Sequence, residues 1–161
     1  MKKKGMADII VTVLLIGLVL ALGSIVWVVV SNLTNKNLQS TQSCFGNYGE
    51  ISLNNQYTCY NTNTKELNFS IIIGDVSVDK VVISISGAGI IKSYSIPGTY
   101  PNAKMFGASS YGGALVLPNK SEGLTYVTKD FQSIPDTIKI APVINGQQCD
   151  YSDTLSQIDT C

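Results

Sequence analysis

The sequence predicts an α+β protein, with one long amino-terminal helix followed by an antiparallel β-sandwich-like domain that two disulfides reinforce. An uncharged apolar run extends from Ile9 to Val30, and four cysteines, an even number, all lie after it. Short segments in which apolar and polar residues alternate follow in the second half of the chain, as expected of half-buried strands. We therefore expect a basic segment at residues 1–5, a helix at 6–36, a linker at 37–43 and a β domain at 44–161.

The apolar run is long enough to cross a membrane. Its sequence, IIVTVLLIGLVLALGSIVWVVV, contains no charge, and a helix of that length rises about 33 Å against a hydrocarbon core of about 30 Å. Lys2, Lys3 and Lys4 come shortly before it, and the positive-inside tendency keeps such a cluster in the cytoplasm. The β domain is therefore expected outside the cell, where disulfides persist.

Two other interpretations fit the same apolar run. A secretory signal peptide would be cut at Ala21-Leu22-Gly23, but the run continues to Val30, so cleavage would leave an apolar terminus on a soluble protein. A plain single-pass anchor fits the charges and the length equally well. Gly17 and Ala21 are four residues apart, which is typical of spans that pack closely on another helix.

The segment Lys2-Lys3-Lys4-Gly5-Met6-Ala7-Asp8 resembles the class III signal of type IV pilins, and the run behind it is more similar to archaeal than to bacterial pilin helices. In that family a prepilin peptidase cuts on the cytoplasmic side, before the apolar segment. The resemblance, which covers residues 1–35, implies cleavage between Gly5 and Met6. Gly5 suits the site because it has no side chain to obstruct the peptidase.

Asp8 would lie at the edge of the hydrocarbon, where a carboxylate is costly unless it is paired. After cleavage, Met6 carries a free ammonium group two residues away, and the helix dipole adds positive charge. Bacterial pilins have a glutamate at the fifth position of the mature chain, which neutralises a neighbouring subunit's amine, whereas the acid here is at the third. The alternative interpretation is that Asp8 is an ordinary interfacial residue outside the bilayer.

The resemblance implies a structural subunit of an archaeal pilus-like surface filament that functions in adhesion or surface attachment. Its expected partners are copies of itself, the prepilin peptidase with the pilus assembly machinery, and the membrane before assembly. Archaellins, which form motility filaments, are the second expectation within the family. A membrane-anchored extracellular binding module that recognises sugars or a partner protein and does not polymerise is the alternative from another class.

The cysteines are expected to form two disulfides. Cys44, Cys59, Cys149 and Cys161 are separated by 15, 90 and 12 residues, without the paired C-x-x-C spacing of a zinc site. Pairing of neighbours would close two short loops. A crossed pairing that ties the first segment to the carboxyl terminus stays open, because sequence does not fix connectivity.

Alternation predicts strands at residues 67–73, 80–86, 90–96, 114–117, 124–128 and 137–144. Gly87-Ala88-Gly89 predicts a hairpin turn between the second and the third of them. The segment from Ile96 to Gly113 is the longest irregular one and is expected to be a surface loop. Its aromatic residues either contact a partner or fold back over the end of the sandwich; they are Tyr100, Phe106 and Tyr111.

Composition argues against several functions. The chain has no histidine, which removes the common catalytic triads and the usual zinc-enzyme ligands. Without residues 1–5, eight lysines face eleven acidic residues, a formal charge of −3 with no arginine, so nucleic acid is not an expected partner. We expect no catalytic residue, cofactor or metal, and a tethered hydrolase is the least favoured hypothesis. Three N-x-S/T sequons are candidates for N-glycosylation: Asn32, Asn68 and Asn119.

Overall fold

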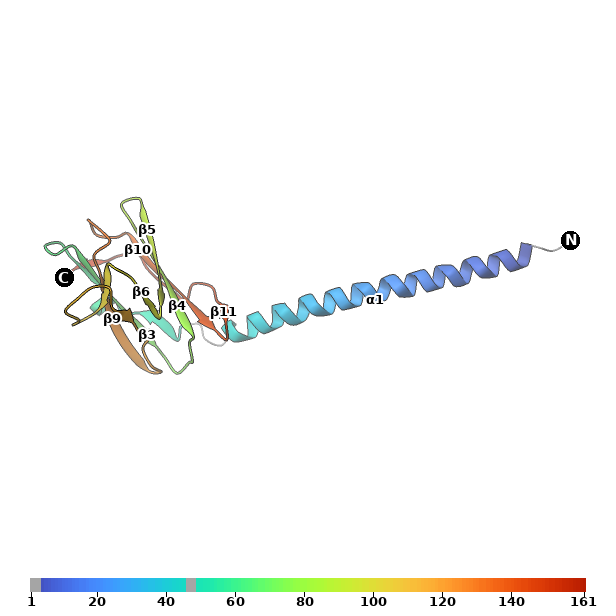
Figure 1. Cartoon of the computed structure of the whole chain (residues 1–161), viewed down its shortest axis with the longest axis horizontal. Helices are drawn as coiled ribbons and strands as arrows, with labels where there is room; N and C mark the ends of the chain where they lie inside the picture. The colour runs from blue at the N-terminus through green and yellow to red at the C-terminus, as the bar shows by residue number, and fades with distance from the viewer. Residues whose placement is uncertain (1–3, 46–48) are drawn as a thin grey trace. The chain divides into compact units, whose positions relative to one another are not determined.

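The computed structural model describes residues 4–45 and 49–161, with the side chains of 4–9, 35–43 and 45 left out of the description. The chain divides into two compact units, Met1–Thr41 and Gln42–Cys161. Secondary structure begins with one α-helix and continues with short strands that are mainly antiparallel (Figure 1). The predicted α+β class, with a long apolar amino-terminal helix and two disulfides, is therefore confirmed.

The helix α1 runs without interruption from Lys4 to Phe45. The prediction of a linker at 37–43 is wrong, since those residues are helical. After Ser24 the sequence contains neither glycine nor proline until Gly46. Polar residues such as Asn, Ser and Thr cost at most about 0.7 kcal/mol each in a helix, so a polar composition does not end a helix where no stop signal is present.

Two sheets make up most of the β domain, which we call the head (residues 42–161). The first has the order β13-β2-β3-β9-β7, with β1 also on β3; its strands are β1 (Ile51–Leu53), β2 (Cys59–Asn61), β3 (Glu66–Ile73), β7 (Ala103–Met105), β9 (Glu122–Thr128) and β13 (Asp159–Thr160). All pairs in this sheet are antiparallel except β2 with β13. The 3₁₀ helix η1 (Asn55–Tyr57) connects β1 to β2.

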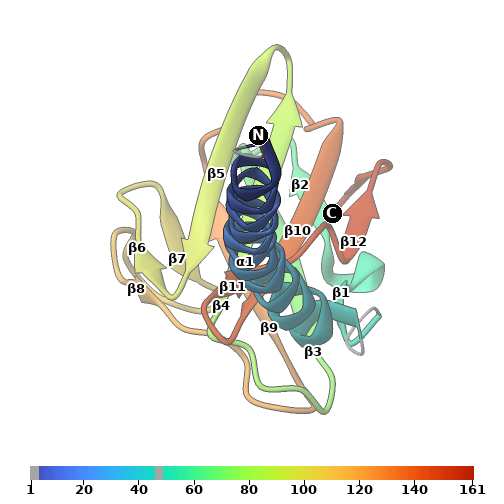
Figure 2. The same ribbon diagram turned by 90° about the vertical axis from the view of Figure 1, so that its right-hand side faces the viewer.

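The second sheet has the order β11-β10-β4-β5, with β12 also on β10; Figure 2 shows its long strands side by side. The strands are β4 (Lys80–Gly87), β5 (Ile90–Ile96), β10 (Thr137–Ile144), β11 (Gln147–Gln148) and β12 (Asp153–Leu155). A separate two-stranded sheet pairs β6 (Gly98–Thr99) with β8 (Ala114–Leu115).

Both large sheets contribute to one hydrophobic core. Alternate apolar residues of β3 and β4 are buried, as the period of two in a strand predicts: Leu67, Phe69, Ile71 and Ile73 on β3, and Val81, Ile83 and Ile85 on β4. The ring of Phe69 packs at the centre, with its centroid 5.3 Å from that of Tyr126 and 6.2 Å from that of Tyr94. Tyr126 comes from the first sheet and Tyr94 from the second, so this aromatic group joins them.

The predicted hairpin is confirmed. Gly87 pairs with Ile90, which leaves Ala88 and Gly89 as a two-residue turn between β4 and β5. Both have positive φ, 50° and 77°, the geometry of a type I′ turn whose twist matches that of the strands. All six predicted segments contain strands whose ends lie within two residues of expectation, although the segment 114–117 shortens to the two residues of β8.

The predicted surface loop from Ile96 to Gly113 is in part wrong, because it contains β6 and β7. The second of these joins the first sheet by pairing with β9, from Ala103 opposite Thr128 to Met105 opposite Tyr126. Each strand has only two or three residues, too few for alternation to be visible in the sequence.

The disulfides follow the crossed pairing: Cys44 bonds Cys149 and Cys59 bonds Cys161, across 105 and 102 residues. The parallel pairing of β13 with β2 explains the second bond, because Asp159 lies opposite Cys59 and the Cys161 N–H donates to the Tyr60 carbonyl at 3.1 Å. In the chain-entropy account, closing a loop of about 100 residues stabilises a fold by about 5 kcal/mol.

Candidate functional site

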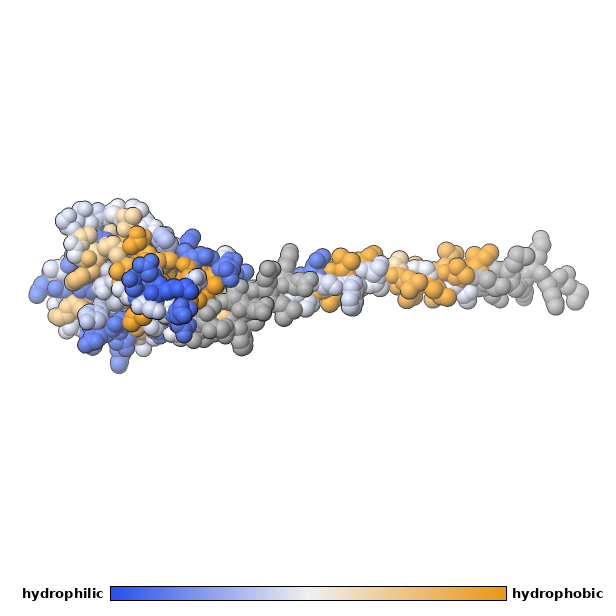
Figure 3. Space-filling view, turned by 90° about the horizontal axis from the view of Figure 1, so that it is seen from below, coloured by the Kyte–Doolittle hydropathy of each residue, from blue (hydrophilic) through white to orange (hydrophobic). Residues whose placement is uncertain are grey.

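The apolar surface of α1 is the most prominent functional feature of the described residues. Residues Ile10–Thr34 form a stretch of 25 residues with a mean hydropathy of 2.9 and no buried side chain. Figure 3 shows hydrophobic side chains along this part of the helix, and Trp27 is the most exposed of them at 75%. A helix that is apolar on all sides requires a membrane or other helices around it.

Small residues leave part of one face of this stretch without bulky side chains. Gly17 and Ala21 lie on one face because they are four residues apart, and a Cβ built at Gly17 would meet no atom within 4 Å. The Ser24 hydroxyl donates to the Ala21 carbonyl at 2.8 Å, so its polar hydrogen is satisfied within the helix. Gly17 and Ala21 therefore share one face of α1, and their role in packing on another helix stays a prediction.

The amino-terminal residues singled out by the sequence are described only in part. Lys2 and Lys3 lie outside the described residues, while Lys4, Gly5, Met6 and Asp8 lie in the first turns of α1 without described side chains. Peptidase cleavage and the charge pairing of Asp8 therefore stay predictions.

The three sequons lie in different surroundings. Asn32 is exposed within the apolar stretch of α1. Asn68 is half-buried on β3, with its amide nitrogen 4.0 Å from the Cys59 Sγ and 3.8 Å from the Cys161 Sγ. Asn119 is exposed beside a turn of the head, where its backbone and side-chain N–H groups donate to Glu122. Of the two sequons in the head, Asn119 is the more accessible, since Asn68 is half-buried beside the Cys59–Cys161 disulfide.

Tyr111 folds back onto the first sheet. Its hydroxyl donates to the Glu66 carboxylate, and the ammonium groups of Lys104 and Lys129 lie over its ring, 4.5 and 4.3 Å from the ring centroid. Burial, together with Glu66, raises the pKa of Tyr111 to about 12. The ring is thus held by cation–π contacts on the sheet rather than presented to a partner.

Tyr100 also folds back, whereas Phe106 does not. The Tyr100 hydroxyl accepts the Ser95 N–H at 2.6 Å, and its ring meets that of Tyr94 edge to face at a centroid distance of 5.1 Å. Phe106 is 65% exposed. Of the three aromatic residues in the segment 96–113, only Phe106 stays a candidate for contact with a partner.

A polar cluster around Asp130 connects the two sheets, and no pattern in the sequence indicates it. Asp130 follows β9. Its carboxylate accepts hydrogen bonds from Tyr94 at 2.5 Å, Asn102 at 2.7 Å and Thr128 at 3.2 Å. It also forms an ion pair with the Lys92 ammonium group at 3.9 Å. Burial by itself raises the pKa of Asp130, but these hydrogen bonds and Lys92 outweigh it and lower the pKa on balance. Burial, with Asp130 nearby, raises the pKa of Tyr94. The cluster is thus a charged, fully bonded structural contact.

Comparison with protein-family models, with curated proteins and with solved structures finds no match for this chain. The features that bear on function are therefore the apolar helix, the residues before it and the disulfide-bonded head.

Proposed function

We propose that the chain is a structural subunit of an archaeal type IV pilus-like surface filament that functions in adhesion or surface attachment. The observation that carries the proposal is a 25-residue apolar helix whose side chains are exposed on all sides, directly behind a segment that contains Lys4, Gly5 and Asp8. As a precursor the chain spans the membrane with its head outside. After cleavage between Gly5 and Met6, the helix moves from lipid into a core of neighbouring helices.

The rules of helix packing in membranes support this transfer of α1 from lipid into a core of helices. Lipid and helix surfaces are similarly apolar, so helices associate through close packing rather than through the hydrophobic effect. Gly17 and Ala21 provide a place for such packing. Asp8 would be neutralised by the Met6 ammonium of a neighbouring subunit, which only cleavage creates. A contact that joins different surfaces of successive copies does not close, and therefore grows into a helical filament.

The head suits the outside of such a filament. Two sheets over one core support a sandwich-like head, and two long-range disulfides are compatible with an oxidising exterior. We propose no catalytic role and no nucleic-acid partner for the chain.

The test is the amino terminus of the protein recovered from the cell surface. Mass spectrometry is expected to show a chain that begins at Met6, and electron microscopy is expected to show filaments that contain it. The variant Gly5→Val places a branched side chain at the cut and is expected to leave the leader attached and to abolish filaments. Gly23→Val is the matched control, since it makes the same change within the span. Surface protein that retains Lys2 to Gly5 would contradict the proposal.

A membrane-anchored binding module is the second candidate, because the same helix and orientation serve an anchor that does not polymerise. In that case the leader stays attached and the purified chain stays monomeric in detergent. The measurement of the amino terminus distinguishes the two, because the filament proposal requires cleavage and the anchor does not.

A further inference from the structure

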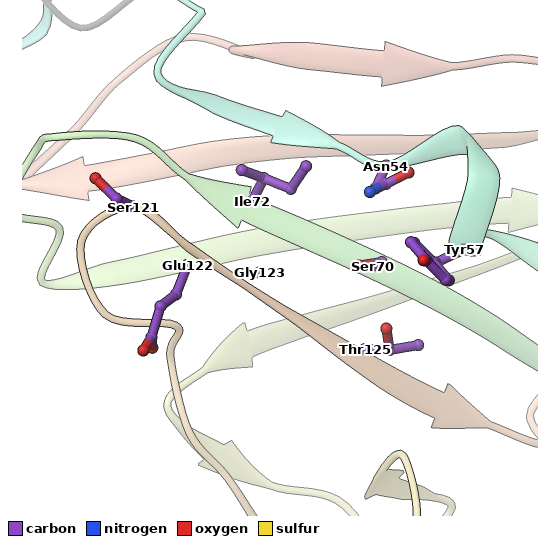
Figure 4. A pocket seen from close by; sticks show the side chains of 8 residues that line it. All are labelled: Asn54, Tyr57, Ser70, Ile72, Ser121, Glu122, Gly123 and Thr125. Atoms are coloured by element: carbon purple, nitrogen blue, oxygen red, sulfur yellow. The ribbon is translucent and has the colours of Figure 1, made fainter.

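A depression of about 390 Å³ lies on the outer face of the first sheet, away from the core. Strand register puts Ser70 opposite Thr125 and Ile72 opposite Gly123, so these four positions share one face of the β3–β9 pair (Figure 4). Gly123 leaves the floor open, because a Cβ there would lie 3.3 Å from the Ile72 Cγ1.

Two hydroxyl groups on the floor have no hydrogen-bond partner among the described residues. Ser70 is only 4% exposed, and its backbone is fully engaged, with the N–H donating to the Thr58 hydroxyl and the carbonyl accepting from Asn54. Its own hydroxyl makes no hydrogen bond within the described chain, and the same holds for that of Thr125. None of the described buried side-chain polar atoms lacks a hydrogen-bond partner, so both free hydroxyls reach the accessible surface of the depression and are available to a molecule that enters it.

The rim adds an exposed ring and further free polar groups. Tyr57, in η1, is 59% exposed, and its hydroxyl has no partner in the described part of the chain. Asn54 caps η1 by accepting the Gln56 N–H through its Oδ1 at 3.0 Å, which leaves its amide N–H groups free to donate. In Figure 4 the side chains of Asn54 and Tyr57 lie beside those of Ser70 and Thr125.

The residues that line the depression limit the class of ligand that it can bind. No lysine is among the residues that line the depression, so it offers no cation to a phosphate or carboxylate ligand. The one lining carboxylate, Glu122, already accepts two hydrogen bonds from Asn119. A purely apolar ligand would cover the hydroxyls of Ser70 and Thr125 without giving them a hydrogen-bond partner, which is unfavourable. The remaining class is neutral, rich in hydroxyl groups, and flat enough on one side to cover a tyrosine ring.

We propose that this depression binds a neutral saccharide, with one sugar ring on the face of Tyr57 and sugar hydroxyls bonded to Ser70, Thr125 and Asn54. An apolar surface combined with a few convergent polar groups is the usual composition of a small-molecule site. The saccharide is either free or a glycan attached to this chain, since Asn119 lies two residues before Ser121 at the edge of the depression. The proposal is independent of filament formation.

The experiment uses the full chain in phosphatidylcholine nanodiscs, because detergents with sugar headgroups would compete. The probes are glucose, galactose, mannose, N-acetylglucosamine, maltose and lactose. Saturation-transfer NMR measures the binding of each. We expect at least one to bind with a Kd of about 1 mM, as is reasonable for a shallow site. Tyr57→Ala is expected to weaken binding about tenfold and Thr125→Val, which keeps the shape, about threefold.

Tyr151→Ala is the matched control, because Tyr151 is a similarly exposed tyrosine at 57% that does not line the depression; its binding is expected to be unchanged. Circular dichroism verifies that each variant is folded. Asn119→Gln distinguishes the sources: equal binding indicates a free saccharide, and binding that appears only in this variant indicates that the chain's own glycan occupies the site. The proposal is overturned if no probe binds to wild type or to Asn119→Gln, or if Tyr57→Ala binds as well as wild type.

Discussion

Asp130 joins side chains from distant parts of the head. Its partners Lys92, Tyr94 and Asn102 are 28 to 38 positions away in the sequence, and they become neighbours only once both sheets have formed. The depression has the same origin, because Ser70 and Thr125 meet only through strand register. The sequence around an aspartate or a serine does not indicate such partners. The cysteines can be assigned to disulfides from the sequence, because a cysteine has few other chemical roles.

We expect the carboxylate of Asp130 to make the stability of the head dependent on pH. Its pKa is lowered in the folded state, so its contribution is present above the unfolded pKa of about 3.9 and is lost as pH falls through the folded value. Asp130→Asn is expected to lower the free energy of unfolding at pH 7 by about 2 kcal/mol, since Tyr94 and Lys92 lose a charged partner.

Thermal unfolding between pH 7 and pH 2 measures this effect as the difference in Tm between wild type and variant. The difference is expected to shrink toward acid. Asp75→Asn is the matched control, because Asp75 makes an exposed ion pair with Lys120 at 3.5 Å, which contributes at most about 1 kcal/mol. A Tm difference for Asp130→Asn that stays constant over this range would contradict the pKa argument.

At the level of elements, length decides what the sequence predicts. The helix and the strands of seven or eight residues were predicted, because apolar periodicity needs several repeats to be visible. Of the described strands of two or three residues, β8 falls in a predicted segment, whereas the others, among them β2 and β13, were missed. The linker prediction fails for a different reason: the polar composition of residues 37–43 does not end α1, because no glycine or proline occurs between Ser24 and Gly46.

The small-residue face of α1 is expected to matter for assembly rather than for membrane insertion. Gly17→Leu raises the hydropathy of the span, so insertion is retained, but it fills the open surface beside Ala21 and prevents close approach of a second helix. Filaments are expected to become rare or short in electron micrographs. Val19→Leu, on the opposite face of the helix, is the control and is expected to assemble normally. Normal filaments from Gly17→Leu would exclude this face as a subunit contact.

For the whole molecule, the crossed disulfides are the decisive long-range feature. Their number was predicted, but their pairing depends on β13 returning beside β2, a contact between the two ends of the head. Because Cys44 bonds Cys149 and Cys59 bonds Cys161, every peptide bond between residues 60 and 148 is bridged by both disulfides. Pairing of neighbours would have left that entire region unbridged.

A single cut in this region tests the connectivity directly. A recognition site for a specific protease, inserted between Gly112 and Gly113 in an exposed segment, is expected to yield one band after cleavage on a non-reducing gel and two bands after reduction. The double variant Cys59→Ser/Cys161→Ser is expected to stay joined through Cys44–Cys149, although with a free energy of unfolding lowered by about 2–5 kcal/mol. Fragments that separate without reductant would require pairing of neighbours. Because both bonds bridge the cut, the nicked chain is expected to keep its two parts joined wherever reductant is absent.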